Sequence, residues 1–142
     1  MYSKILIPLD GTEAAEKAIP NVLELASYNN AEVHLLYVAS NPAIGYAWDY
    51  PVIATTNFIE MEENARRYIE KIRDKIAQKG VKVSAEVCDG AVAPAIIDVA
   101  EKENVDLIAM YTHARKGLSR LLMGSFTEEV IHDSPIPVLV VH

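Results

Sequence analysis

The sequence predicts an α/β fold: a doubly wound, five-stranded parallel sheet with helices on both faces. Short apolar runs typical of buried strands alternate along the chain with longer stretches in which apolar residues recur at helical spacing. Parallel neighbours in a sheet need crossover connections, which are right-handed and usually helical, so this alternation favours a mostly parallel sheet. With 51% hydrophobic and 23% charged residues, the composition is that of a globular protein. We expect a single domain over residues 1–142, because no repeat or low-complexity linker interrupts the chain.

The predicted strands are short runs rich in apolar and β-branched residues. The first, KILIPL, ends in Asp10-Gly11, and the last, PVLVVH, closes the chain. The five strands cover residues 4–9, 31–40, 81–88, 106–111 and 137–142. The last strand has no helix of its own, and if it lies at the edge of the sheet, Val138 to Val141 would expose an apolar row of unpaired backbone groups. A partner chain is the simplest cover for such an edge.

Helical spacing of apolar residues marks the segments between the strands. Pro20 interrupts the first helix and is expected to kink or split it near Ile19. The second is a long amphipathic helix that stops at Gly80. The four predicted helices cover residues 12–28, 58–76, 91–103 and 125 to about 132, and a loop over residues 41–57 precedes the second of them.

Charge and cysteine content limit the classes of partner. A net charge of −7 and a pI near 5.0 argue against general binding to nucleic acid or to a membrane surface. Cys88 is the only cysteine, so no internal disulfide can form, which suits a reducing compartment. The apolar run at the start of the chain is too short for a signal peptide, and no stretch could span a bilayer. The cytoplasm is therefore the expected location.

The acidic chain gathers positive charge in one segment, YTHARKGLSRLLMGSFTEEVIH, just before the last predicted helix. Arg115, Lys116 and Arg120 precede the helix that begins at Ser125. Ligands of doubly wound sheets bind at the carboxyl ends of the strands, where the direction of winding reverses. If the first and fourth strands are neighbours there, Asp10 and the basic loop face one crevice, and the helix directs its free N–H groups at it. The sequence predicts an anion, most simply a phosphate, in that crevice.

The first and last parts of the chain carry a family resemblance. KILIPLDGTEAAEKAI resembles the opening strand and helix of the universal stress protein family, and the segment from DGAVAPAIIDVAEKENVDLIAMY to PIPVLVV resembles its closing half. The resemblance covers the chain from end to end. It implies a sheet in the order 3-2-1-4-5 and, in many members, a bound ATP or AMP, with Mg²⁺ or Mn²⁺. It also implies a homodimer joined along the fifth strand, through Val138, Leu139, Val140 and Val141.

The nucleotide signature of that family is Gly, two residues, Gly, nine residues, and then Gly followed by Ser or Thr. On this sequence the four positions fall on Tyr111, Ala114, Gly124 and Ser125, so only the second half matches. Phe126 stands where the family usually has the smaller Val, and Arg115 contributes the charge of the basic loop. The resemblance implies further contacts at positions whose residues are of the family's type, namely Pro8, Asp10, Val38, Met110 and His113.

Tyr111 is the departure with the largest expected consequence. A glycine in such a loop usually provides a positive φ or a close approach of the backbone to the ligand. A tyrosine forced into a strained backbone region costs about 1–3 kcal/mol. We therefore expect Tyr111 to weaken nucleotide binding, and replacing both Tyr111 and Ala114 with glycine to strengthen it.

The same residues also have purely structural interpretations. Asp10 with Glu13, and Ser125 with Glu128, have the spacing of capping boxes, so each could simply cap a helix. His113 is more readily a structural hydrogen-bonding group than a proton donor. The four histidines show no spacing that suggests a metal site. The aromatic residues of the loop over 41–57 could form a lid, a dimer contact or a packing contact with the core: Tyr46, Trp48 and Tyr50.

Three functions compete on this evidence. The first is a homodimeric regulatory protein of the stress response that binds an adenine nucleotide weakly. The second is a non-nucleotide interaction protein of the same fold, with the pocket blocked by Tyr111. The third is an enzyme of adenylate or flavin chemistry, but no paired carboxylates or nucleophile with its base stand out. We expect at most slow ATP hydrolysis, without assigned catalytic residues.

Overall fold

The structure is a computed structural model that describes residues 1–39, 51–112 and 125–142, with the backbone alone for residues 51–57 and Ser125. Its strands form one parallel sheet in the order β3-β2-β1-β4-β5, which confirms the expected fold class and strand order. The strands are β1 (Lys4–Leu9), β2 (Glu32–Ala39), β3 (Val83–Asp89), β4 (Leu107–Tyr111) and β5 (Val138–Val141). The helices are α1 (Glu13–Glu16), α2 (Ile19–Asn29), α3 (Pro51–Ala77), α4 (Val92–Lys102) and α5 (Ser125–Asp133).

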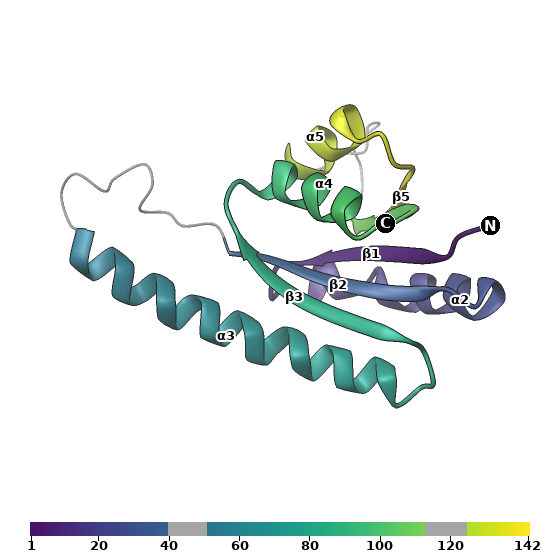
Figure 1. Cartoon of the computed structure of the whole chain (residues 1–142), viewed down its shortest axis with the longest axis horizontal. Helices are drawn as coiled ribbons and strands as arrows, with labels where there is room; N and C mark the ends of the chain where they lie inside the picture. Colours follow the sequence, from purple (N-terminus) through teal and green to yellow (C-terminus); the bar gives the residue numbers. More distant parts are fainter. Residues whose placement is uncertain (40–50, 113–124) are drawn as a thin grey trace, which may run out of the picture.

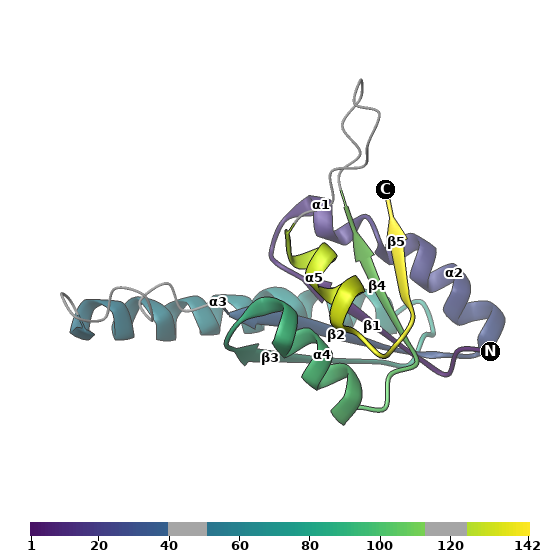
Figure 2. The ribbon, with the colours of Figure 1, turned by 90° about the horizontal axis from the view of Figure 1, so that it is seen from above.

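Helices cover both faces of the sheet, as the alternation of elements predicts. Figures 1 and 2 show α2 and α3 on one face and α4 with α5 on the other. Each face has its own apolar cluster. Ile7 and Leu35 belong to the cluster under α2 and α3, and Leu6 and Leu36 belong to the one under α4 and α5. Successive residues of a strand therefore point to opposite faces, and the strands are buried on both sides.

The first predicted helix is divided into two, as Pro20 indicates. The short α1 ends at Glu16, and α2 begins at Ile19 with the proline in its first turn. Proline has no N–H to donate and clashes with the preceding turn, so it fits the start of a helix and not its interior. The expected break near Ile19 is confirmed.

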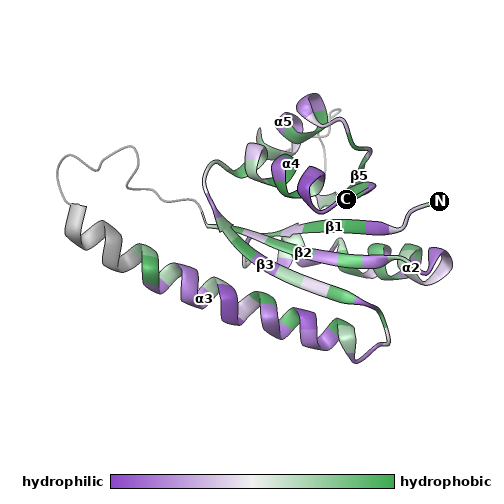
Figure 3. Cartoon of the chain, in the orientation of Figure 1, coloured by the Kyte–Doolittle hydropathy of each residue, from purple (hydrophilic) through white to green (hydrophobic). Residues whose placement is uncertain are grey.

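The long helix α3 corrects one sequence-based boundary. It begins at Pro51 and not near Phe58, so the end of the expected loop over residues 41–57 is helical. Figure 3 shows apolar and polar residues alternating along α3, as expected for a helix with one face on the sheet. The chain leaves α3 through Gly80, whose φ of 81° suits a residue without a Cβ. Although α3 has 27 residues, neither it nor any other helix in the described ranges is apolar enough to cross a membrane.

The last strand lies at the edge of the sheet. β5 pairs with β4 from Ile108–Val138 to Tyr111–Val141, and Figure 2 shows it at the margin of the sheet. All four of its residues are half-buried. Leu139 and Val141 pack against the α2–α3 cluster and Val138 against the α4–α5 cluster. The expected edge position of this apolar strand is confirmed.

Candidate functional site

The winding of the sheet reverses between β1 and β4. From β1 the chain proceeds outward through β2 to β3, and on the other side from β4 to β5. The ladder between β1 and β4 is formed at Ile5–Leu107 and Leu6–Ile108 and stops short of Pro8, which has no N–H to donate. β1 and β2, in contrast, pair over six positions. The carboxyl ends of β1 and β4 are therefore where a ligand crevice is expected in such a sheet.

Three residues implied by the family resemblance lie on one face at this end of the sheet. Val38 and Met110 both pack against the α4–α5 cluster. Pro8 follows Leu6, a member of the same cluster, by two positions in β1 and so points to the same side. Met110 is buried, with 8% of its surface exposed, and Pro8 is half-buried. The structure thus brings Pro8, Val38 and Met110 together on the α4–α5 side.

Asp10 is exposed directly after β1, and it does not cap α1 as its spacing with Glu13 allowed. Its Oδ1 accepts two hydrogen bonds from Thr12, one from the backbone N–H at 2.9 Å and one from the hydroxyl at 2.6 Å. The cap is Thr12 itself, whose Oγ1 accepts the N–H of Ala15 at 3.3 Å. Gly11, with a φ of 86°, makes the turn between them. Asp10 therefore stabilises the turn at the mouth of the crevice by binding Thr12, which in turn caps α1.

Tyr111 has an ordinary strand backbone, which corrects the expected strain. It pairs with Val141 in the β4–β5 ladder. In the described ranges, the non-glycine residues with positive φ are Asn30 and Asn104. The Tyr111 ring packs against the α2–α3 cluster, on the face opposite to Met110. The position thus shows no backbone requirement for glycine, and the ring lies away from Pro8, Val38 and Met110.

Thr112 is a residue of this end of the sheet that the sequence pattern did not single out. Its N–H donates to the carbonyl of Val141 at 2.8 Å, which continues the ladder one step beyond β4. Only 3% of its surface is exposed, and its hydroxyl oxygen is buried without a hydrogen-bond partner among the described residues. Leaving such a group unpaired costs about 1–3 kcal/mol. By strand alternation from Met110, the side chain belongs to the α4–α5 side. A hydroxyl directly after β4 is the signal that could have identified it.

The helix start at the crevice is where the sequence predicts it. α5 begins at Ser125 and runs from the carboxyl end of β4 back along the sheet (Figure 2), so its amino end is directed toward the crevice side. Phe126 is 52% exposed, and Thr127 and Val130 are buried. The other predicted contacts of this segment lie outside the described residues: His113, Ala114, Arg115 and Gly124, with Lys116 and Arg120. The side chain of Ser125 and the aromatic loop with Tyr46, Trp48 and Tyr50 also lie outside them.

A second polar cluster lies on β2 and β3, away from the crevice. The ring of His34 is 6% exposed, with Nδ1 at 2.6 Å from Ser84 Oγ and Nε2 at 3.0 Å from Glu86 Oε1. Such contacts satisfy a buried imidazole, so the arrangement is structural. In the described part of the chain, no group of three His, Cys, Asp or Glu side chains could hold a metal ion.

A parallel sheet with helices on both faces and a reversal of winding between β1 and β4 defines the class of doubly wound α/β proteins. Within this class the chain belongs to the universal stress protein family, whose model matches residues 1–142. Universal stress protein MJ0531 of Methanocaldococcus jannaschii is 34% identical over 99% of this chain and 82% of its own length.

Solved structures share the fold. That of the hypothetical protein MJ0577, a universal stress protein of Methanocaldococcus jannaschii, is 35% identical, with a TM-score of 0.84 over 99% of this chain and 96% of that chain. The universal stress protein from Archaeoglobus fulgidus in complex with dAMP is 18% identical, with a TM-score of 0.67 over 99% of this chain and 98% of that chain.

Proposed function

We propose that this protein is a regulatory binding protein of the stress response that holds an adenine nucleotide, ATP or AMP, at the carboxyl ends of β1 and β4. The observation that carries the proposal is the placement of Pro8, Val38 and Met110 on one face at the switch point of the sheet. Two apolar side chains and a proline provide a wall for a flat base. Asp10 stands exposed at the end of β1, in reach of the polar part of a ligand there.

Two further features support a phosphate-bearing ligand. The nine-residue helix α5 begins on the crevice side, and the N–H groups of its first turn attract an anion. The buried hydroxyl of Thr112 has no hydrogen-bond partner in the described part of the chain, so a phosphate or ribose that reached it would supply the missing hydrogen bond. A universal stress protein of the same fold binds dAMP, an adenine nucleotide. Arg115, Gly124 and Ser125 complete the proposed contacts, together with His113, Ala114 and Phe126.

The blocked-pocket alternative required the Tyr111 ring to occupy the crevice. The ring packs against the α2–α3 cluster, so the geometry favours the nucleotide over this alternative. With no group of three metal-ligating side chains among the described residues, a Mg²⁺ or Mn²⁺ ion would be held mainly by the phosphates that it accompanies. Any hydrolysis of ATP would then depend on water and the ion, and we propose that it is slow.

We also propose a homodimer joined along β5. The strand is apolar, lies at the edge and is half-buried in the single chain. Val140 in particular is absent from both apolar clusters, whereas its neighbours Leu139 and Val141 pack inward. A second copy of β5 would cover this surface and pair its free edge.

Calorimetric titration with ATP and AMP tests the nucleotide proposal. Val38→Phe fills the proposed wall and is expected to weaken binding by about tenfold or more. Val87→Phe is the matched control, because Val87 is a half-buried strand residue that packs on the α2–α3 side. The control should lose comparable stability and keep its affinity. Absence of any binding heat for the wild type at millimolar ATP would end the proposal. Equal losses of ATP affinity in both variants would show that the site is not on this face of the sheet.

A further inference from the structure

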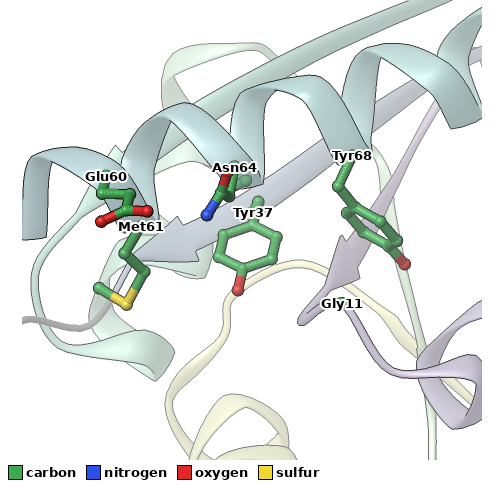
Figure 4. Close-up of a pocket in the computed structure, with 7 residues that line it drawn as sticks. Gly11, Tyr37, Glu60, Met61, Asn64 and Tyr68 are labelled. Atoms are coloured by element: carbon green, nitrogen blue, oxygen red, sulfur yellow. The ribbon is translucent and has the colours of Figure 1, made fainter. Parts of the chain in front are cut away.

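A cavity of about 400 Å³, largely open to solvent, lies on the opposite side of the sheet from the proposed crevice. Figure 4 shows Glu60, Met61, Asn64 and Tyr68 on α3 around a space that Tyr37 of β2 and Gly11 close from the sheet side. Tyr37 packs against the α2–α3 cluster, while the next residue, Val38, packs against the α4–α5 cluster. A volume of this size is typical of pockets for small molecules.

Two aromatic rings form the wall of the cavity. The rings of Tyr37 and Tyr68 meet edge to face, with centroids 6.1 Å apart and an interplanar angle of 74°. The hydroxyl of Tyr68 donates a hydrogen bond to Glu16 Oε2 at 2.9 Å, which fixes the ring between α3 and α1. Both tyrosines are half-buried, and both line the cavity. The wall is thus aromatic, and the Tyr68 ring is held by its hydrogen bond to Glu16 and its contact with Tyr37.

Gly11 keeps this space open beside Tyr37. A Cβ at this position would lie 3.6 Å from Tyr37 Cε2 and 3.7 Å from its hydroxyl oxygen, in ordinary contact. The backbone also has a φ of 86°, which side-chain-bearing residues rarely adopt. Any larger residue would therefore narrow the cavity at the tyrosine ring.

The charged side chains of the described residues that line the cavity, or lie directly behind its wall, are negative. Glu60 lines it, and Glu16 lies directly behind the Tyr68 hydroxyl. Burial raises the pKa of Tyr68 well above its ordinary value, and the neighbouring carboxylates of Glu16 and Asp10 raise it further. No lysine or arginine is among the described residues that line the space. An anionic ligand would meet repulsion here, whereas a cation would be attracted.

We propose that this cavity binds a small organic cation of the quaternary ammonium class. The electron-rich faces of aromatic rings attract such a cation, and Glu60 supplies the opposing charge. The Met61 thioether offers an apolar, polarizable surface to alkyl groups, and the Asn64 amide can bond a hydroxyl on the ligand. This site lies on the opposite face of β2 from the proposed nucleotide wall, and the two sites adjoin at the turn of Asp10 and Gly11.

Titration of the full-length protein with choline, followed through backbone amide shifts in NMR, tests the proposal. The uncharged control ligand is 3,3-dimethylbutan-1-ol, which has the shape of choline with carbon in place of nitrogen. Shifts at Gly11, Tyr37 and Asn64 that saturate with choline and are absent or much weaker with the alcohol are expected. Equal affinity for the two ligands would overturn the cationic class, and no shift at these amides would overturn the site. With excess ATP present, the choline titration followed at Tyr37 and Asn64 should be unchanged, and displacement of choline by ATP would show that the site is not separate.

Variants separate the contributions of ring and charge. Glu60→Gln removes the lining carboxylate from an exposed helix position and should weaken choline binding by about two- to fivefold. The matched control is Glu63→Gln on the same helix, whose carboxylate pairs with Arg67 at 3.6 Å and does not line the cavity. Tyr37→Leu should weaken binding further. Because Tyr37→Leu also disturbs packing, Glu60→Gln decides the outcome: affinity equal to that of Glu63→Gln would refute the role of Glu60.

Discussion

The ammonium group of Lys17 lies 5.4 Å from the centroid of the Tyr111 ring. Lys17 follows α1, so this cation–π contact holds the ring on the α2–α3 side of the sheet. Met110 packs on the other side, under α4 and α5. The tyrosine at the first glycine position of the family signature is therefore part of a packing layer and not of the proposed nucleotide wall.

Tyr111→Ala should consequently lower stability and leave nucleotide affinity almost unchanged. Loss of a half-buried ring and its contact with Lys17 is expected to reduce the free energy of unfolding by about 1–3 kcal/mol. Affinity for ATP should stay within about twofold, because the backbone at this position is unstrained. Urea denaturation and calorimetry measure the two quantities. A fivefold or larger gain in affinity would contradict this geometry and restore the expectation that Tyr111 obstructs the site.

Acid should weaken the attachment of the amino end of β1. Asp106 accepts the N–H of Ser3 at 2.7 Å and the N–H of Lys4 at 3.1 Å. Burial alone would raise the pKa of Asp106, but these hydrogen bonds outweigh it and leave the pKa below its ordinary value. Because the pKa of Asp106 is lowered in the folded state, its contribution to stability is complete at pH values above its unfolded-state pKa of about 3.9. That stabilisation is lost as the pH falls further, through the folded-state pKa.

Asp106→Asn is the variant that tests this pH dependence. At neutral pH it should reduce the free energy of unfolding by about 1–2 kcal/mol, because an amide is the weaker acceptor and brings a donor of its own. The deficit relative to the wild type should shrink below about pH 4. Asp98→Asn, at an exposed position of α4, is the control and should run parallel to the wild type. A constant deficit for Asp106→Asn down to the acid transition would exclude this role.

The fold follows from local signals that agree with one another. Apolar runs mark strands that are buried on both faces, and Pro20 marks the break between α1 and α2. The start of α3 could not be predicted, because Val52, Ile53, Thr55 and Thr56 are β-branched and have low helix propensity. Pro51, which suits a first helical position, was the one signal for the earlier start.

The sequence predicted which strand ends form the candidate site, but not the orientation of Tyr111, the cap of α1 or the buried hydroxyl of Thr112. Alternation along β4 already separates Tyr111 from Met110, but alignment with the family signature assigned both to one ligand. The capping role of Thr12 depends on the turn at Gly11, where a positive φ brings Asp10 and Thr12 together. The missing partner of the Thr112 hydroxyl is a property of three-dimensional packing, which residue spacing does not reveal.

Val140→Lys should convert the proposed dimer into a monomer. A lysine at the centre of an apolar β5 edge would place its charge in the interface at a cost of several kcal/mol. Sedimentation velocity at micromolar concentration should show a dimer for the wild type and a monomer for the variant. Glu101→Lys is the control, since it adds positive charge at an exposed position of α4. A wild type that is monomeric at this concentration would remove the dimer proposal.

Thr112→Val should make the free protein more stable and the nucleotide complex weaker. The hydroxyl of Thr112 is buried without a partner in the ranges that the structure describes, so valine, which has the same shape, should relieve a cost of about 1–3 kcal/mol. If the hydroxyl contacts the ligand, the same change removes a hydrogen bond from the complex and should reduce ATP affinity by about fivefold or more. Thr112→Ser keeps the hydroxyl and should bind ATP like the wild type.

Thermal unfolding without ligand and calorimetry with ATP give the two readouts. A purely structural role would move stability alone, so wild-type affinity in Thr112→Val would exclude Thr112 from the site and leave the nucleotide proposal to be judged on Val38.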